Sequence, residues 1–148
     1  MTSLLTSCPS PAASCHYRIE ADRNMQIEEY AGRVGLEDLR EMASVVAADP
    51  ERSGRHNRLV DLSNAELDLS SDDVLRFALL MRTEKHRSTG WHAFAVGSAT
   101  VFSMVRMLSY WARVSERCRI FRSRDEAERW LEVNSAGSPA LVPSMSVA

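Results

Sequence analysis

Apolar and polar positions repeat along this chain with two different periods, which divide it into strands and helices. Short runs with β-branched and aromatic residues predict strands at 15–20, 25–32, 58–63, 91–98 and 117–121. Apolar residues three and four positions apart predict amphipathic helices at 36–48, 71–86, 99–114 and 123–133. The order ββαβαβαβα predicts an α/β fold, in which four helices cover a mixed, mostly parallel sheet of five strands that opens with an antiparallel hairpin.

The two ends of the chain differ from this patterned region. Residues 1–14 and 134–148 contain no charged side chain and are rich in serine and proline, so we expect disordered tails there. The patterned residues 15–133 are enough for one domain with its own hydrophobic core.

Composition limits the partners and the compartment of the protein. Its 18 basic and 20 acidic side chains nearly balance, which gives no electrostatic reason to expect a nucleic acid as partner. No apolar run reaches the roughly 18 residues of a membrane span, and we expect no integral membrane segment. Three cysteines without a Cys-x-x-Cys pair favour free thiols in a reducing compartment, and therefore a cytoplasmic protein.

The most acidic stretch, residues 59–73, is the strongest candidate for a catalytic cluster. It holds five carboxylates and no basic side chain. Only Asp61 falls at the carboxyl end of a predicted strand, where open α/β sheets place their sites. We interpret the stretch as a strand, an acidic connection at 63–73 and a capped helix start, and we expect no catalytic residue and no enzymatic activity.

The sequence also lacks the spacing patterns of metal and cofactor sites. The four histidines are scattered along the chain, and none forms a zinc-type pattern with a cysteine. Glycine-rich phosphate loops and a Gly-x-Ser-x-Gly nucleophile elbow do not occur. We therefore expect no metal and no cofactor, and we interpret the histidines as structural.

Four segments carry a resemblance to a known family: EEYAGRVGLEDLREMASVVAADP, RLVDLSNAELDLSSDDVLRFA, HAFAVGSATVFSMVRML and RIFRSRDEAERWL. Together with the element order, they resemble the STAS fold of anti-sigma-factor antagonists, and more closely the small single-domain SpoIIAA-like proteins of bacteria. By fold, that group is also linked to CRAL-TRIO lipid-binding domains. The resemblance implies a non-enzymatic regulatory domain that interacts with another protein.

In the STAS antagonists, a serine at the start of the helix after this strand is phosphorylated by a partner kinase. On that pattern, Ser70 and Ser71 fall at the phosphoacceptor region. The chain departs from the family here, because Leu69 stands in place of the family's Asp and Asp72 in place of its Gly. A phosphate would also be repelled by the neighbouring carboxylates, so these departures disfavour a phosphorylation switch.

A second stripe of residues on the predicted helix 99–114 is a candidate contact surface. Apolar and arginine side chains alternate on it, a composition that protein interfaces prefer: Phe102, Arg106, Met107, Tyr110 and Arg113. The same stripe could instead pack under the edge of the sheet, or meet the chain and headgroup of an amphiphile. Asp61 and Ser63, at the acidic connection, complete the candidate interaction or ligand surface.

These observations lead to two functional hypotheses. The preferred one is a non-enzymatic regulatory or protein-interaction domain that forms a homodimer and binds a protein partner not identifiable from sequence. The alternative is a carrier that holds a lipid-like or other apolar small molecule between the helices 71–86 and 99–114.

Overall fold

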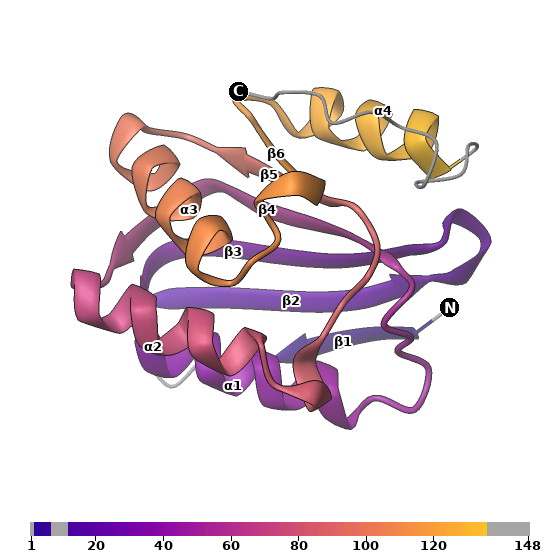
Figure 1. Ribbon diagram of the computed structural model, residues 1–148, viewed down its shortest axis with the longest axis horizontal. Helices are drawn as coiled ribbons and strands as arrows, with labels where there is room; N and C mark the ends of the chain where they lie inside the picture. The colour runs from indigo at the N-terminus through magenta and orange to yellow at the C-terminus, as the bar shows by residue number, and fades with distance from the viewer. Residues whose placement is uncertain (1, 7–11, 136–148) are drawn as a thin grey trace.

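The computed structural model describes residues 2–6 and 12–135, which form one six-stranded sheet with strands in the order of the sequence (Figure 1). The strands β1, β2 and β3 pair antiparallel, and β3 to β6 pair parallel. The strands are β1 (Thr2–Thr6), β2 (Ala13–Glu20), β3 (Met25–Gly35), β4 (Asn57–Asp68), β5 (His92–Val96) and β6 (Cys118–Phe121). The helices are α1 (Leu36–Ala48), α2 (Ser71–Met81), α3 (Ala99–Trp111) and α4 (Arg124–Ser135), with 3-10 turns η1 (Ala21–Arg23), η2 (Glu84–His86) and η3 (Ser115–Arg117).

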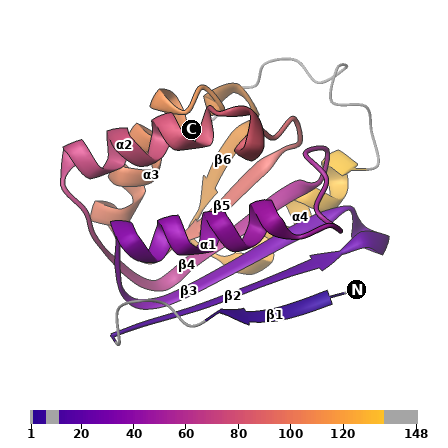
Figure 2. The ribbon, with the colours of Figure 1, turned by 90° about the horizontal axis from the view of Figure 1, so that it is seen from below.

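The helices cover the two faces of the sheet unequally (Figures 1 and 2). Side chains of α1, α2 and α3 pack on one face in the larger core, which includes Met42, Phe77 and Val105. On the other face, Ala127 and Leu131 of α4 pack in a smaller core. Because side chains alternate along a strand, successive residues of β3, β4 and β5 belong to different cores.

The expected fold class is confirmed: this is an α/β fold with a mostly parallel sheet, an antiparallel start and four α-helices. The sheet has one strand more than expected, however. Residues 2–6 form β1, which pairs along β2, and β2 already begins at Ala13. The prediction of a disordered tail at 1–14 is therefore wrong for these residues, while residues 1 and 7–11 lie outside the described part of the chain.

The carboxyl ends of two elements also differ from expectation. Strand β4 extends to Asp68 and pairs with β3 up to Gly35, so most of the predicted acidic connection is strand. Helix α4 includes residues 134 and 135, and the rest of the predicted C-terminal tail lies outside the described residues.

The structure shows whether two of the cysteines are in a disulfide. Cys15 is disulfide-bonded and Cys118 is free. The expectation of free thiols is therefore wrong at Cys15. Among the described residues, no helix combines the length and the apolar character needed to cross a bilayer.

Gly97, just after β5, gives a test of how tightly the two central parallel strands approach each other. A Cβ at Gly97 would lie 2.3 Å from the carbonyl oxygen of Ser63, whereas a Cβ at Gly35 would have its nearest neighbour at 3.8 Å. We expect Gly97→Ala to lower the free energy of unfolding by about 2–3 kcal/mol, because backbone must move to relieve the overlap. Urea unfolding measures this loss. The control Gly35→Ala should cost less than about 1 kcal/mol, the effect of a poorer helix cap, and equal losses would contradict the close approach.

Candidate functional site

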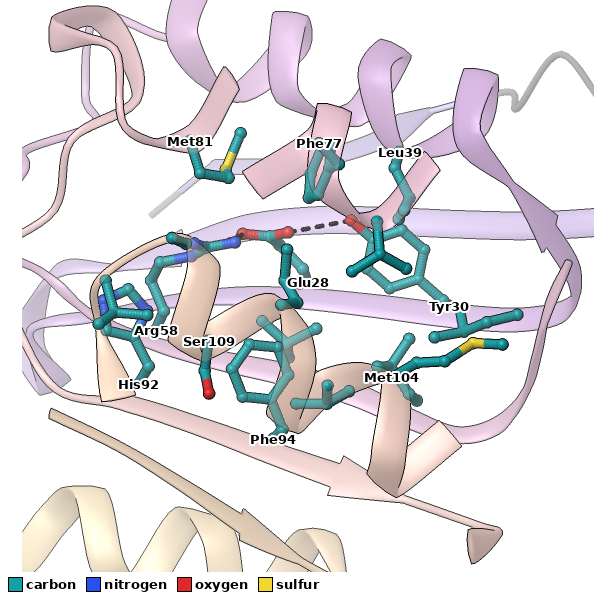
Figure 3. Close-up of a pocket in the computed structure, with 18 of the residues that line it drawn as sticks. Glu28, Tyr30, Leu39, Arg58, Phe77, Met81, His92, Phe94, Met104 and Ser109 are labelled. Carbon is teal, nitrogen blue, oxygen red and sulfur yellow. Dashed lines mark hydrogen bonds and ion pairs between the residues drawn. The ribbon is translucent and has the colours of Figure 1, made fainter. Parts of the chain in front are cut away.

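A pocket lies between the sheet and the helices α2 and α3 (Figure 3). Its cavity volume is about 70 Å³. Most of its lining is apolar and comes from α1, α2, α3, the inner faces of the strands and the segments that adjoin them: Leu39, Val60, Leu62, Leu67, Leu69, Val74, Phe77, Met81, Phe94, Met104, Val105, Leu108, Ala112 and Val114. Its polar lining consists of Glu28, Tyr30, Arg58, His86, Ser88, His92 and Ser109.

A row of polar side chains crosses the sheet on this helix-covered face. Gln26 of β3 is in register with Arg58 of β4, Arg58 with His92 of β5, and His92 with Cys118 of β6. Residues far apart in the sequence therefore become neighbours by parallel pairing alone. The next positions along the strands on the same face, such as Val60 and Phe94, are residues of the hydrophobic core, so the polar row borders that core.

Arg58 of this row forms an ion pair with Glu28, which lies two residues after Gln26 on β3; the Glu28 carboxylate is buried and the Arg58 side chain is 16% exposed. Nη2 and Nε of Arg58 lie 2.7 and 3.1 Å from Oε2 of Glu28, which is only 3% exposed. The carboxylate also accepts hydrogen bonds from Gln26 (2.7 Å) and from the hydroxyl of Tyr30 (3.0 Å). Burial alone would lower the pKa of Arg58, but the charge and hydrogen bonds of Glu28 outweigh it and raise this pKa.

His92 lies beside this pair without a hydrogen bond. It is 2% exposed, and neither ring nitrogen has a partner among the described residues. Burial, and then the charges of Arg58 and Arg117, hold the pKa of His92 well below its usual value, so the ring is neutral at pH 7. A buried polar group without a partner costs about 1–3 kcal/mol, and native proteins contain few of them.

The loop that precedes β5 adds a second group of this kind. The hydroxyl of Ser88 is buried and has no partner among the described residues. Three of the five such atoms in the described chain thus belong to His92 and Ser88, which line one pocket. Arg117 of η3 fixes this loop by donating to the carbonyl oxygens of Ser88 (2.8 Å) and Gly90 (3.2 Å).

Two further groups that can ionise, Cys118 at the end of the row and Tyr30 beside Glu28, are held in their protonated forms. Burial raises the pKa of the Cys118 thiol to about 12. Burial, and then the charge of Glu28, raises the pKa of Tyr30 well above its usual value. At neutral pH the pocket therefore presents the neutral phenol of Tyr30 and the neutral imidazole of His92 beside the ion pair of Arg58 with Glu28.

The residues singled out at the acidic stretch lie away from this pocket. The carboxylate of Asp61 accepts a hydrogen bond from the backbone of Ser63 (2.9 Å) and pairs with Arg124 of α4 (3.4 Å), on the other face of the sheet. Ser70 caps α2: its hydroxyl accepts from the Asp73 amide at 3.1 Å, and the Asp73 carboxylate accepts from the Ser70 amide at 3.0 Å. Ser71 is the first residue of α2 and is exposed. Phosphorylation of either serine stays a prediction.

The candidate surface on α3 is only partly exposed. Tyr110 is 72% exposed, and Arg106 and Arg113 are exposed as well. Met107 is half-buried, and Phe102 packs against the larger core. Because Asp61 is bound to α4, the structure does not join the acidic residues and the α3 residues into one surface.

The pocket's polar residues were not identified from the sequence. From the sequence, His92 is expected to be structural, and no role is expected for Glu28, Arg58 or Ser88. A signal does exist: each of Glu28, Arg58 and His92 falls in a strand at a position whose parity matches buried apolar residues, such as Tyr30, Val60 and Phe94. The expected place for an apolar ligand, between the second and third predicted helices, does coincide with the pocket.

Comparison with known proteins supports the fold. No protein-family model and no curated protein matches the chain. The structure is similar to that of an uncharacterised protein of the DUF3478 family with a SpoIIAA-like fold, from Shewanella loihica PV-4. The two share 16% sequence identity, the match covers 85% of this chain and 98% of the other, and the TM-score is 0.55. The resemblance to the SpoIIAA-like, STAS-type fold is confirmed at the level of the fold.

The ion pair gives a stability prediction. Glu28→Ala should lower the free energy of unfolding by about 3–5 kcal/mol, because it leaves the Arg58 charge buried without its counter-charge. Replacing both partners with apolar residues, Glu28→Leu with Arg58→Met, should restore most of this loss. The exposed pair of Glu37 with Arg40 (3.2 Å) is the control, and Glu37→Ala should cost less than about 1 kcal/mol. Chemical unfolding of all four proteins decides, and a double variant as unstable as Glu28→Ala would refute the explanation.

Proposed function

We propose that this protein is a non-enzymatic binding domain that takes a small, mainly apolar molecule into the pocket between α2, α3 and the sheet. The observation that carries the proposal is the combination of an apolar cavity with unpartnered buried polar groups at one end. Ligand pockets in proteins combine apolar walls with a few placed polar groups in this way. The carrier hypothesis from the sequence is therefore favoured over the protein-interaction hypothesis.

The size of the cavity limits what it accepts without movement. At about 70 Å³ it has half the volume of the apolar cavity of roughly 150 Å³ that holds benzene. A ligand of drug size needs at least 300 Å³, so it would have to displace α2 or α3. Each of these helices has three buried residues, Val74, Phe77 and Ala78 in α2 and Val101, Val105 and Ser109 in α3.

A pocket-filling variant tests this function. Ala112 is buried, lines the pocket and lies at the end of α3, so Ala112→Leu should fill the cavity from one side. We expect native mass spectrometry of the gently purified protein to show added organic mass that denaturation releases. Ala112→Leu should lose this mass while its thermal stability stays equal or rises.

The matched control is Ala48→Leu, which adds the same apolar group at an exposed position at the end of α1. It should keep the bound mass. A wild-type protein that carries no added mass, and that no small apolar compound stabilises against heat, would refute the binding function.

A regulatory, protein-interaction domain that forms a homodimer is the second candidate. The SpoIIAA-like fold supports it, and so does the exposed Tyr110 between Arg106 and Arg113 on α3. An aromatic side chain flanked by arginines has the composition of an interface centre. Phosphorylation at Ser70 or Ser71 would belong to this candidate.

Light scattering after gel filtration tests the second candidate. If α3 forms a dimer interface, Tyr110→Glu should raise the dissociation constant of the dimer at least tenfold, because the variant buries an unpaired charge in the interface. Ser44→Glu, at an exposed position of α1, should leave the mass unchanged. A wild-type protein that is monomeric at all concentrations would remove the homodimer from the proposal.

The cytoplasmic location expected from the sequence stays a prediction. The disulfide at Cys15 argues against that location, because a reducing cytoplasm keeps thiols free. The half-buried Cys118, with its raised pKa, is compatible with either compartment.

A further inference from the structure

The two ends of the pocket differ in polarity, and this difference specifies the ligand further. Figure 3 shows Arg58 and His92 together at one end, and Met104 towards the other. Ser88 lies four residues before His92, in the loop that leads into β5, and lines the same pocket. Arg117 links the two residues, because it donates to the Ser88 carbonyl oxygen and its charge acts on His92. The unpartnered groups therefore converge at one end, and the apolar side chains form the rest of the cavity.

The charges around the polar end do not cancel. Arg58 is balanced by Glu28 at 2.7 Å. Arg117 donates to the carbonyl oxygens of Ser88 and Gly90, which are neutral acceptors. The charged neighbours that act on His92 are both arginines, Arg58 and Arg117. The potential at the polar end is therefore positive, and a negative group placed there would be stabilised.

We propose that the pocket binds a small apolar monocarboxylic acid, with its carboxylate at His92 and Ser88 and its hydrocarbon part between α2 and α3. This inference rests on the proposed binding function and adds the chemical class of the ligand. The Ser88 hydroxyl and a ring N–H of His92 donate to the two carboxylate oxygens. The walls that meet the hydrocarbon part include Phe77, Phe94 and Leu108.

Binding of a carboxylate would change the protonation of His92. Other ionisable groups surround the ring or line the same pocket: Glu28 and Tyr30 on β3, Arg58 on β4, His86 on η2, Arg117 on η3 and Cys118 on β6. In the free protein the pKa of His92 lies well below its usual value, so the ring is neutral at pH 7. A carboxylate next to the ring raises this pKa. Binding therefore takes up a proton, and the affinity falls as pH rises through the pKa of the complex.

A series of ligands with one chain length and different head groups tests the inference. We would titrate the full-length protein by calorimetry with hexanoate, hexan-1-ol and hexylamine at pH 6 and pH 8. All three are larger than the cavity of about 70 Å³, so each requires the same movement of α2 or α3 and the comparison isolates the head group. Hexanoate should bind at least about tenfold more tightly than the alcohol and the amine, since only it matches the positive potential. Its binding heat should depend on the ionisation enthalpy of the buffer, which reports the proton uptake, and its affinity should be lower at pH 8.

Variants assign the head-group site. His92→Phe and Ser88→Ala should each weaken hexanoate binding at least about tenfold, and His92→Phe should abolish the buffer dependence. His16→Phe is the control, because His16 is exposed on β2, outside the pocket, and it should bind as the wild type does. Should His92→Phe fail to fold, the imidazole signals of His92 in NMR spectra provide the second readout, and they should move to the protonated position when hexanoate is added.

The outcomes separate this inference from the proposed function. Equal affinity for hexanol and hexanoate, lost in Ala112→Leu, would keep the binding function and overturn the carboxylic acid. Tight hexanoate binding that survives both His92→Phe and Ser88→Ala would also overturn it. If none of the three compounds binds and the wild type carries no added mass, both proposals fail, and His92 and Ser88 are hydrated groups of a closed core.

Discussion

The ion pair of Arg58 with Glu28 is the interaction on which the arrangement of this protein depends. Desolvating two charges costs several kcal/mol per ion, so such a pair persists only when further hydrogen bonds satisfy it. Gln26 and Tyr30 supply them here. The pair occupies sheet positions where an apolar side chain would otherwise fill the space beneath α2 and α3. The ion pair and the cavity therefore have the same cause, which is the presence of polar residues at these strand positions.

The two faces of the sheet show what this choice changes. On the face of α4, Trp91 packs edge-on against Trp130 with ring centroids 5.5 Å apart, and Ala127 and Leu131 are fully buried. Charges on that side lie at the rim, where Arg23 binds Glu128 at 2.8 Å. On the face of α1, α2 and α3 the charges lie inside, next to a cavity. The α4 side of the sheet therefore has a small apolar core with its charges at the rim, whereas the other side combines the larger core with a cavity and an inner ion pair.

The fold could be predicted from the sequence because periodicity is local: α1 and α3 each show their apolar stripe within 13 residues. Local patterns do not predict the segments that become strands only because they pair with another strand. The uncharged Thr2–Thr6 resembles a tail until β2 pairs with it, and the acidic end of β4 resembles a loop until β3 extends beside it. The polar row of the pocket is hidden from the sequence for the same reason, although the place of the pocket between the two helices is not. Arg58, His92 and Cys118 are separated by 34 and 26 positions, and only the parallel register makes them a row.

The two candidate functions are physically compatible, because α2 and α3 serve both. Their inner sides line the pocket, and α3 carries the exposed Tyr110 on its outer side. A ligand larger than the cavity of about 70 Å³ would separate these helices and alter the outer surface with them. Such a ligand changes the affinity for a protein partner only if it binds one helix arrangement more tightly than the other, and at most by that difference in binding free energy. A tightly bound ligand that fits without moving α2 or α3 would leave the partner surface unchanged. The size of the bound molecule is therefore what distinguishes a carrier from a ligand-controlled regulator.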